Sequence, residues 1–195
     1  MNSEAKDIYI IDMGSFHTPK LIAAVGSLGH YVTAKPYTKI DRKTFKEIVQ
    51  EYDGLIISGS QKNIGEKDFP NLPFVNLPKI PLLAICYGMQ LIGHKKGVNI
   101  VPCNKGMGEK GEYELNILDD SILWDGLDDR YNEVFHFHEN MLQSVPPGWR
   151  LTSETEHTPV ASIEKDDKYF CTQFHPECNE ATKNVIIKNF IEKVC

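Results

Sequence analysis

Cys86 lies where a short buried strand is predicted to meet a helix. The apolar run 82–85 precedes it, and a helical pattern of apolar positions follows it. Ala84 and Gly88 stand two positions before and after it, which is the spacing of a nucleophile elbow with cysteine in place of serine. Such a turn presents the thiol at a helix N-terminus, where N–H groups and the helix dipole favour a thiolate and an oxyanion. The alternative is a buried cysteine that serves only as a small core residue.

His175 and Glu177 supply the residue types that a cysteine nucleophile needs beside it. They follow a predicted strand over 169–174 and are separated by Pro176, whose fixed φ stiffens the spacing. A histidine at a strand end can accept the thiol proton, and a carboxylate can fix its tautomer and stabilise the imidazolium. The alternative is a histidine–glutamate pair in a surface turn.

Gly59 and Tyr87 are the candidate donors for an oxyanion. Gly59 ends a predicted strand over 53–59, and a glycine there lets the backbone approach a ligand closely. Its N–H and that of Tyr87 would give two donors to a tetrahedral intermediate. The alternative is a glycine required only for the turn.

These residues must be positioned by alternating strands and helices, which predict a parallel sheet covered by helices on both faces. Ligands of such sheets bind beyond the carboxyl ends of the strands, where Gly59 and Cys86 fall. We expect the first four strands at 7–12, 31–34, 53–59 and 82–85, with helices beginning at Thr18 and after Asp41 and one short helix within 69–77.

The pattern changes after Gly97 and predicts a hairpin-rich insertion. The segment 180–194 has apolar residues at helical spacing and is predicted to be a terminal amphipathic helix packed on the sheet. Further strands are expected at 98–102, 113–118, 133–138, 160–163 and 168–174, with a short helical or turn segment at 121–127.

The composition is that of an ordinary globular protein, with 195 residues, 41% hydrophobic and 25% charged, and we expect one domain over 1–195. A net charge of −6 gives no basic footprint for nucleic acid. The chain has no apolar run of membrane-spanning length, and its first residues lack the apolar core of a signal peptide. Five cysteines without a C-x-x-C pair disfavour a disulfide framework or a zinc ribbon, so a cytoplasmic location is expected.

Together, these residues resemble the class I glutamine amidotransferases. Residues 84–90 are similar to the G-I-C-Y-G-M-Q of the glutaminase part of GMP synthetases, and residues 173–177 match the family's Q-F-H-P-E. Residues 123–127 also resemble the family's L-F-x-G-L. The resemblance covers the whole chain and implies a flavodoxin-like α/β fold with a mostly parallel sheet.

The resemblance implies a mechanism and partners. Cys86 would attack the side-chain amide of glutamine and form a γ-glutamyl thioester, with His175 as acid and base, Glu177 as its orienter, and Gly59 and Tyr87 as oxyanion donors. Ammonia would pass to a separate ATP-dependent synthetase, of the GMP synthetase type. The glutaminase step would need no metal or cofactor, since ATP and Mg²⁺ belong to the synthetase.

The resemblance also implies substrate-binding residues, of which Gln90 would face the substrate one helical turn beyond Cys86. The others are His138, Glu139 and Asn140. They occupy the last three positions of the GMP-synthetase pattern M-S-H-G-D, which reads His-Phe-His-Glu-Asn here. Glu139 replaces a glycine and adds bulk and negative charge, which suits a substrate with a free amine nearby or a rearranged loop. The family's S-G-G-P is also altered, because Ser60-Gln61 replaces its second glycine and its proline.

His136 and His138 alternate on one strand face, which could suggest a metal site. No third ligand stands at convincing spacing, and His138 matches the family histidine, so no metal site is expected. Cys171 is expected in the core, and whether Cys178 lies close enough to Cys86 for oxidative pairing stays open.

Two other functions compete with that of a glutaminase supplying a synthetase. A stand-alone γ-glutamyl hydrolase or peptidase would use the same residues without an ammonia acceptor, and the altered segments favour it. A non-catalytic regulatory protein of the same fold is a third hypothesis, against which the presence of Cys86, His175 and Glu177 together argues.

Overall fold

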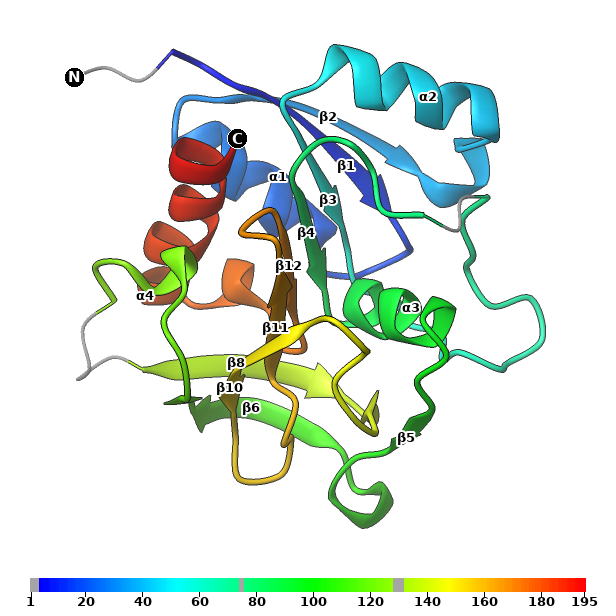
Figure 1. The fold of residues 1–195 in the computed structure, drawn as a ribbon, viewed down its shortest axis with the longest axis vertical. Helices are drawn as coiled ribbons and strands as arrows, with labels where there is room; N and C mark the ends of the chain where they lie inside the picture. Colours follow the sequence, from blue (N-terminus) through cyan, green and yellow to red (C-terminus); the bar gives the residue numbers. More distant parts are fainter. Residues whose placement is uncertain (1–3, 74–75, 128–131) are drawn as a thin grey trace.

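The computed structural model describes residues 4–73, 76–127 and 132–195, and an eight-stranded sheet forms its centre (Figure 1). The strand order is β2-β1-β3-β4-β12-β11-β10-β7; neighbours among the first five are parallel, and the remaining three strands are antiparallel. The strands are β1 (Asp7–Asp12), β2 (Tyr31–Pro36), β3 (Gly54–Ile57), β4 (Leu82–Ile85), β7 (Asn116–Ile117), β10 (Arg150–Glu154), β11 (Ser162–Lys165) and β12 (Tyr169–Thr172). The predicted mostly parallel α/β sheet is confirmed.

The central strands are apolar on both faces because both faces are covered. All four residues of β3 and all four of β4 are buried, as their unbroken apolar runs predict. Two separate clusters of buried side chains lie on the two sides of the sheet, as expected for a sheet sandwiched between helices.

Helices α1 (Thr18–Ser27) and α2 (Arg42–Glu51) begin where the sequence predicts. Pro19 occupies the first turn of α1, and Gly29 follows the helix with φ +86°. Asp41 caps α2 by accepting a hydrogen bond from the backbone N–H of Thr44 at 2.7 Å.

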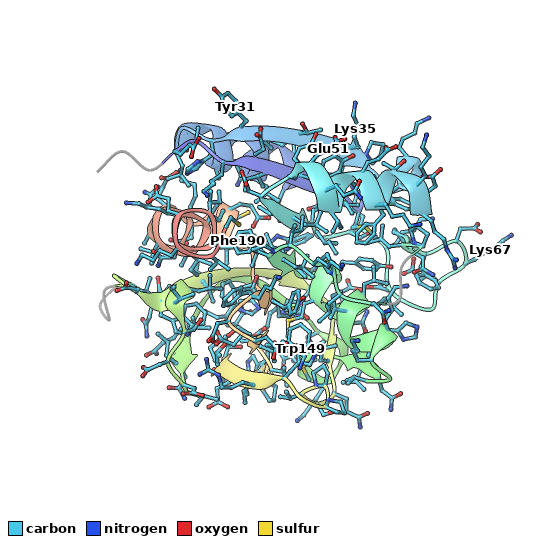
Figure 2. All side chains as sticks on the ribbon, turned by 45° about the horizontal axis from the view of Figure 1, so that its top comes forward. Tyr31, Lys35, Glu51, Lys67, Trp149 and Phe190 are labelled. Atoms are coloured by element: carbon cyan, nitrogen blue, oxygen red, sulfur yellow. The ribbon has the colours of Figure 1, made fainter. Side chains whose placement is uncertain are left out.

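Helix α1 and the C-terminal helical segment cover one face of the sheet, whereas α2 and α3 (Tyr87–Lys95) cover the other (Figure 1). The C-terminal segment comprises α4 (Glu180–Thr182) and two π-helical stretches, η6 (Lys183–Ile187) and η7 (Phe190–Val194). Figure 2 shows Phe190 pointing into the interior from this segment, where it is fully buried. The predicted terminal amphipathic helix is therefore confirmed, although its turns are wider than those of an α-helix.

The predicted hairpin-rich insertion forms two small antiparallel sheets beyond the ends of β3 and β4 (Figure 1). One sheet pairs β5 (Ile100–Pro102) with β9 (Asn140–Leu142), and the other pairs β6 (Glu109–Glu114) with β8 (Glu133–His138). The strand expected over 113–118 is instead divided between β6 and β7, because buried Leu115 separates two strands that belong to different sheets.

The short helix expected within 69–77 is not found among its described residues, and residues 74–75 lie outside the described part of the chain. Prolines interrupt the segment, and side chains of α3 hold it as a loop: the Tyr87 hydroxyl donates to the Pro70 carbonyl, and Lys95 donates to the Leu72 carbonyl.

Among the described residues, no helix combines the length and apolarity needed to cross a membrane.

Candidate active site

Three neighbouring strands bring the predicted site residues to one edge of the sheet. Strand β4 pairs in parallel with β3 on one side and with β12 on the other. The carboxyl ends of β3, β4 and β12 lead to Gly59, Cys86 and His175, respectively. Residues distant in sequence therefore meet where parallel α/β sheets bind ligands.

Cys86 occupies a strained turn between β4 and α3. Its backbone has φ +52° and ψ −106°, a conformation that residues with a side chain rarely adopt. Its N–H donates to the Thr172 carbonyl at 2.6 Å, and its carbonyl accepts the Gln90 N–H of α3 at 3.1 Å. A Cβ at Gly88 would lie 2.7 Å from the Ile57 carbonyl oxygen, so glycine is required for this close approach. The predicted nucleophile elbow is present.

His175 and Glu177 form a buried pair next to this turn. Nδ1 of His175 lies 2.8 Å from Oε1 of Glu177, and the side chains are 3% and 2% exposed. The backbone N–H of His175 donates to the Phe135 carbonyl at 2.7 Å, which fixes the segment against the insertion. In the described part of the chain, Oε2 of Glu177 has no hydrogen-bond partner.

The electrostatics of this pair favour an imidazolium. Burial lowers the pKa of His175, but the Glu177 carboxylate and the hydrogen-bonded Cys86 sulfur outweigh burial and raise this pKa to about 10. His175 is thus poised to stay protonated at neutral pH beside the Cys86 sulfur, an arrangement that suits a cysteine nucleophile.

The Cys86 sulfur is nearly enclosed, because the residue is only 4% exposed. The Gln173 side-chain amide donates to Sγ at 3.5 Å, and the Phe137 carbonyl oxygen lies 3.9 Å from Sγ. Gln173 was not predicted as a site residue, although its place in the Q-F-H-P-E run beside the histidine was the available signal.

Gly59 lies against both catalytic side chains. A Cβ at this position would be 3.0 Å from His175 Cε1 and 3.6 Å from Cys86 Cβ. Its strand end is anchored by Ser58, whose hydroxyl accepts the backbone N–H of Met13 at 2.9 Å. Gly59 therefore lies beside Cys86, and Tyr87 directly follows Cys86 at the start of α3. The role of their backbone N–H groups as oxyanion donors stays a prediction.

Of the predicted substrate-binding residues, Gln90 and Asn140 contact each other. The Gln90 side-chain Nε2 donates to the Asn140 carbonyl at 2.6 Å and to Gln173 Oε1 at 3.2 Å. Gln90 is buried, and its amide nitrogen is thus held by protein groups beside the nucleophile. Glu139 is exposed and faces a cavity, whereas His138 is buried.

His138 belongs to a buried polar network centred on Glu109, which sequence reasoning missed. Glu109 is fully buried, and its Oε2 lies 3.0 Å from both His138 Nε2 and His136 Nδ1. Thr155 and Thr158 donate their hydroxyls to the same carboxylate. Burial raises the pKa of Glu109, but the hydrogen bonds from His136, His138 and Thr158 outweigh burial and lower this pKa to well below its usual range.

This network connects to the nucleophile through the end of β8. His138 Nδ1 donates to the Asn140 carbonyl at 3.1 Å, and the neighbouring Phe137 contributes the carbonyl next to Cys86 Sγ. The buried carboxylate therefore fixes the strand that closes one side of the site.

Two groups of side chains among the described residues could approach a metal ion. Cys103, Glu109 and His138 form one such group, so His138 has neighbouring donors that the sequence spacing did not indicate. These donors are fully buried and are already hydrogen-bonded to protein groups. The other group contains His17, Cys178 and the catalytic His175.

His17 lies directly beside the catalytic histidine and was also missed. Its ring meets that of His175 at a centroid distance of 4.8 Å and packs edge-on against Phe135 and Phe137. Burial and the nearby His175 lower the pKa of His17.

Cys171 is in the core, as predicted, and Cys178 is half-buried, with its pKa raised to about 12 chiefly by burial.

The comparisons with known proteins agree with this geometry. The family profile described as glutamine amidotransferase class-I matches residues 9–194. The chain is 32% identical over 199 residues to the GMP synthase (glutamine-hydrolyzing) of Petrotoga mobilis and 30% identical over 197 residues to that of Streptococcus pyogenes. These alignments cover 96% and 99% of this chain but only 36% and 37% of the relatives, so the chain spans about a third of their length.

Solved structures share the fold. A GMP synthase subunit protein of Thermoplasma acidophilum superposes with a TM-score of 0.77 at 23% identity, covering 96% of this chain and 93% of that one. A glutamine amidotransferase of Thermotoga maritima gives a TM-score of 0.67 at 18% identity, covering 97% and 82%.

Proposed function

Because this chain belongs to the class-I glutamine amidotransferases, a family of glutamine-hydrolysing enzymes, we propose that it releases ammonia from glutamine through a thioester on Cys86 and supplies it to a synthetase. One observation carries this proposal: a thiol on a strained elbow lies beside a buried histidine–carboxylate pair. Both halves of that arrangement are needed for covalent catalysis at neutral pH.

The first half of the reaction forms the thioester. The Cys86 thiolate attacks the side-chain amide carbon of glutamine, and the carbonyl oxygen takes the negative charge. The backbone N–H groups of Gly59 and Tyr87 donate to that oxygen. The tetrahedral intermediate then collapses, the C–N bond breaks, and the His175 imidazolium gives its proton to the departing ammonia.

The second half restores the enzyme. A water molecule gives a proton to neutral His175 and attacks the thioester carbon. The C–S bond breaks, glutamate leaves, and the thiolate and imidazolium are regenerated. Glu177 keeps the ring oriented through Nδ1 and stabilises its positive charge in both halves.

The acceptor is proposed from the relatives. The curated relatives are GMP synthases. We therefore assign the ammonia to an ATP-dependent synthetase partner that aminates XMP, with the reaction in the cytoplasm. ATP and Mg²⁺ would belong to that partner, and the residues described above suffice for hydrolysis of the amide.

The test is covalent labelling with a glutamine analogue that carries an electrophilic diazoketone in place of the amide, followed by peptide mass spectrometry. We expect one adduct, on Cys86, that is lost in His175→Ala. Iodoacetamide, which lacks the amino-acid part, serves as a control for the nucleophile alone. Labelling by iodoacetamide but not by the analogue would reject glutamine as the substrate, and labelling by neither would reject the catalytic role.

A further inference from the structure

A cavity of about 140 Å³, lined by both polar and apolar groups, lies next to the hollow beside His175. Its walls include Ser60, Gln61 and Phe137, which also line the small hollow of about 20 Å³ beside His175. The two spaces therefore form one depression that leads outward from the catalytic histidine. The hollow has room for about one water molecule, which needs ~10–15 Å³, whereas the cavity is several-fold larger and admits a small polar group.

Two opposite charges line this cavity. Lys110, on β6, and Glu139, which follows β8, place Nζ and Oε1 4.0 Å apart, at the outer limit of an ion pair. Their side chains are 57% and 62% exposed, so the pair contributes little to stability and separates at little cost. The Lys110 ammonium also lies 5.6 Å from the centroid of the Phe137 ring, the aromatic wall shared with the hollow.

We propose that Lys110 and Glu139 bind the zwitterionic amino-acid head of a γ-glutamyl substrate, with the α-carboxylate on Lys110 and the α-ammonium on Glu139. This inference rests on the proposed function, since it assumes that the amide end of the substrate reaches Cys86. A head with both charges can replace each partner of the existing pair, so neither side chain is left unpaired. Only two methylene groups separate the amide carbon of glutamine from Cα, which matches a subsite that directly adjoins the hollow.

The proposal defines the substrate class. Both the α-amino and the α-carboxyl group must be free, as in glutamine itself and in γ-glutamyl amines. A glutamine within a polypeptide has neither group free, so it would leave both Lys110 and Glu139 without counterions. The site should therefore reject proteins and accept small amino acids.

The experiment measures the rate of Cys86 labelling by three diazoketone probes in Glu139→Gln and Lys110→Gln. The first probe has the complete glutamine head, the second lacks the α-amine, and the third carries an α-methyl ester. The matched controls are Lys43→Gln and Glu47→Gln, which remove an exposed ion pair of 3.7 Å on α2. Iodoacetamide reports the reactivity of the thiol in every variant.

We expect Glu139→Gln to slow labelling of Cys86 by the complete probe about 10-fold. Labelling by the probe without the amine should be unchanged, because that probe has no ammonium group to bind residue 139. Lys110→Gln should slow the complete probe by about the same factor and leave the methyl ester unchanged. The two α2 variants should not differ from the wild type.

Equal slowing of all three probes in either variant, or no slowing of the complete probe, would overturn the subsite. Failure of the proposed function has a different signature, because the complete probe would then not label Cys86 in the wild type although iodoacetamide does.

Discussion

Replacing Glu177 by Gln removes the negative charge next to the catalytic histidine and keeps an oxygen that can accept the Nδ1 proton. The ring of His175 should therefore keep its orientation, and the loss of activity should reflect charge alone. We expect the imidazolium form to be destabilised, and with it the reactive ion pair between His175 and Cys86.

The size of the effect follows from the geometry. Nδ1 of His175 and Oε1 of Glu177 are 2.8 Å apart, and both side chains are almost fully buried. Two unit charges whose centres lie about 4 Å apart interact by roughly 4 kcal/mol at the effective dielectric constant of protein sites. Because 1.36 kcal/mol corresponds to one pKa unit, the pKa of His175 should fall from about 10 by roughly three.

The assay is the pH dependence of Cys86 alkylation by iodoacetamide. In the wild type, His175 stays protonated through neutral pH, so the rate should change little between about pH 6 and pH 8. In Glu177→Gln, a His175 pKa of about 7 falls inside this window, so the alkylation rate should change between pH 6 and pH 8 with a midpoint near the pH at which the imidazolium is lost. Circular dichroism checks that the variant is folded.

Stability gives an independent measure of the same effect. A histidine with a raised pKa stabilises the folded state below its unfolded pKa of about 6.5, and this contribution is lost as the pH rises toward about 10. The difference in unfolding free energy between wild type and Glu177→Gln should therefore shrink from pH 7 to pH 9. If the alkylation profiles superimpose, Glu177 acts only as an orienting group, and the electrostatic reasoning is refuted.

The other predictions concern stability and are measured by urea unfolding. Gly88→Ala should destabilise the fold by about 1–3 kcal/mol, because its Cβ would meet the Ile57 carbonyl, and an unchanged midpoint would contradict the tight elbow. Gly26→Ala lies in open space inside α1 and should stabilise the fold by up to about 1 kcal/mol; destabilisation would show that the site is not open. Glu109→Leu should cost about 3–5 kcal/mol at pH 7, because buried donors lose their acceptor, and Glu109→Gln should cost less. Since folding lowers the pKa of Glu109, the loss of unfolding free energy of each Glu109 variant relative to the wild type should become smaller as the pH falls below about 4.3. A loss that grows at low pH would show that the carboxylate is not ionised in the folded protein.

The elbow and the histidine–carboxylate pair could be predicted because their signals are local in the sequence. The elbow is defined by Ala84, Cys86 and Gly88, whose spacing encodes the turn regardless of distant contacts. His175 and Glu177 are only two residues apart, so their pairing also needed no knowledge of the fold.

The support of the site could not be predicted in the same way, since it depends on contacts between distant segments. Glu109 follows a glycine in the insertion, and nothing near it in sequence indicates burial or contact with His138. The substrate-facing role of Gln90 stays a prediction, and its bond to the Asn140 carbonyl could not be predicted because it depends on how the insertion folds back.

Strands β9 and β10 were not predicted for a similar reason, because they too depend on contacts between distant segments. Strand β9 has only three residues, and β10 reads Arg-Leu-Thr-Ser-Glu, so neither has the apolar alternation of a half-buried strand. Their pairing with β5 and with β7 and β11 comes from the topology.

The pairing of β4 with β12 has a consequence for how the enzyme comes into being. These adjacent strands hold the nucleophile and its base, yet the entire insertion lies between them in the sequence. Contacts of such long sequence separation close large loops and tend to form late and slowly in folding. During synthesis, the pairing of Cys86 with His175 cannot form until β12 and residues 175–177 have emerged, so a shorter growing chain exposes a cysteine without its base.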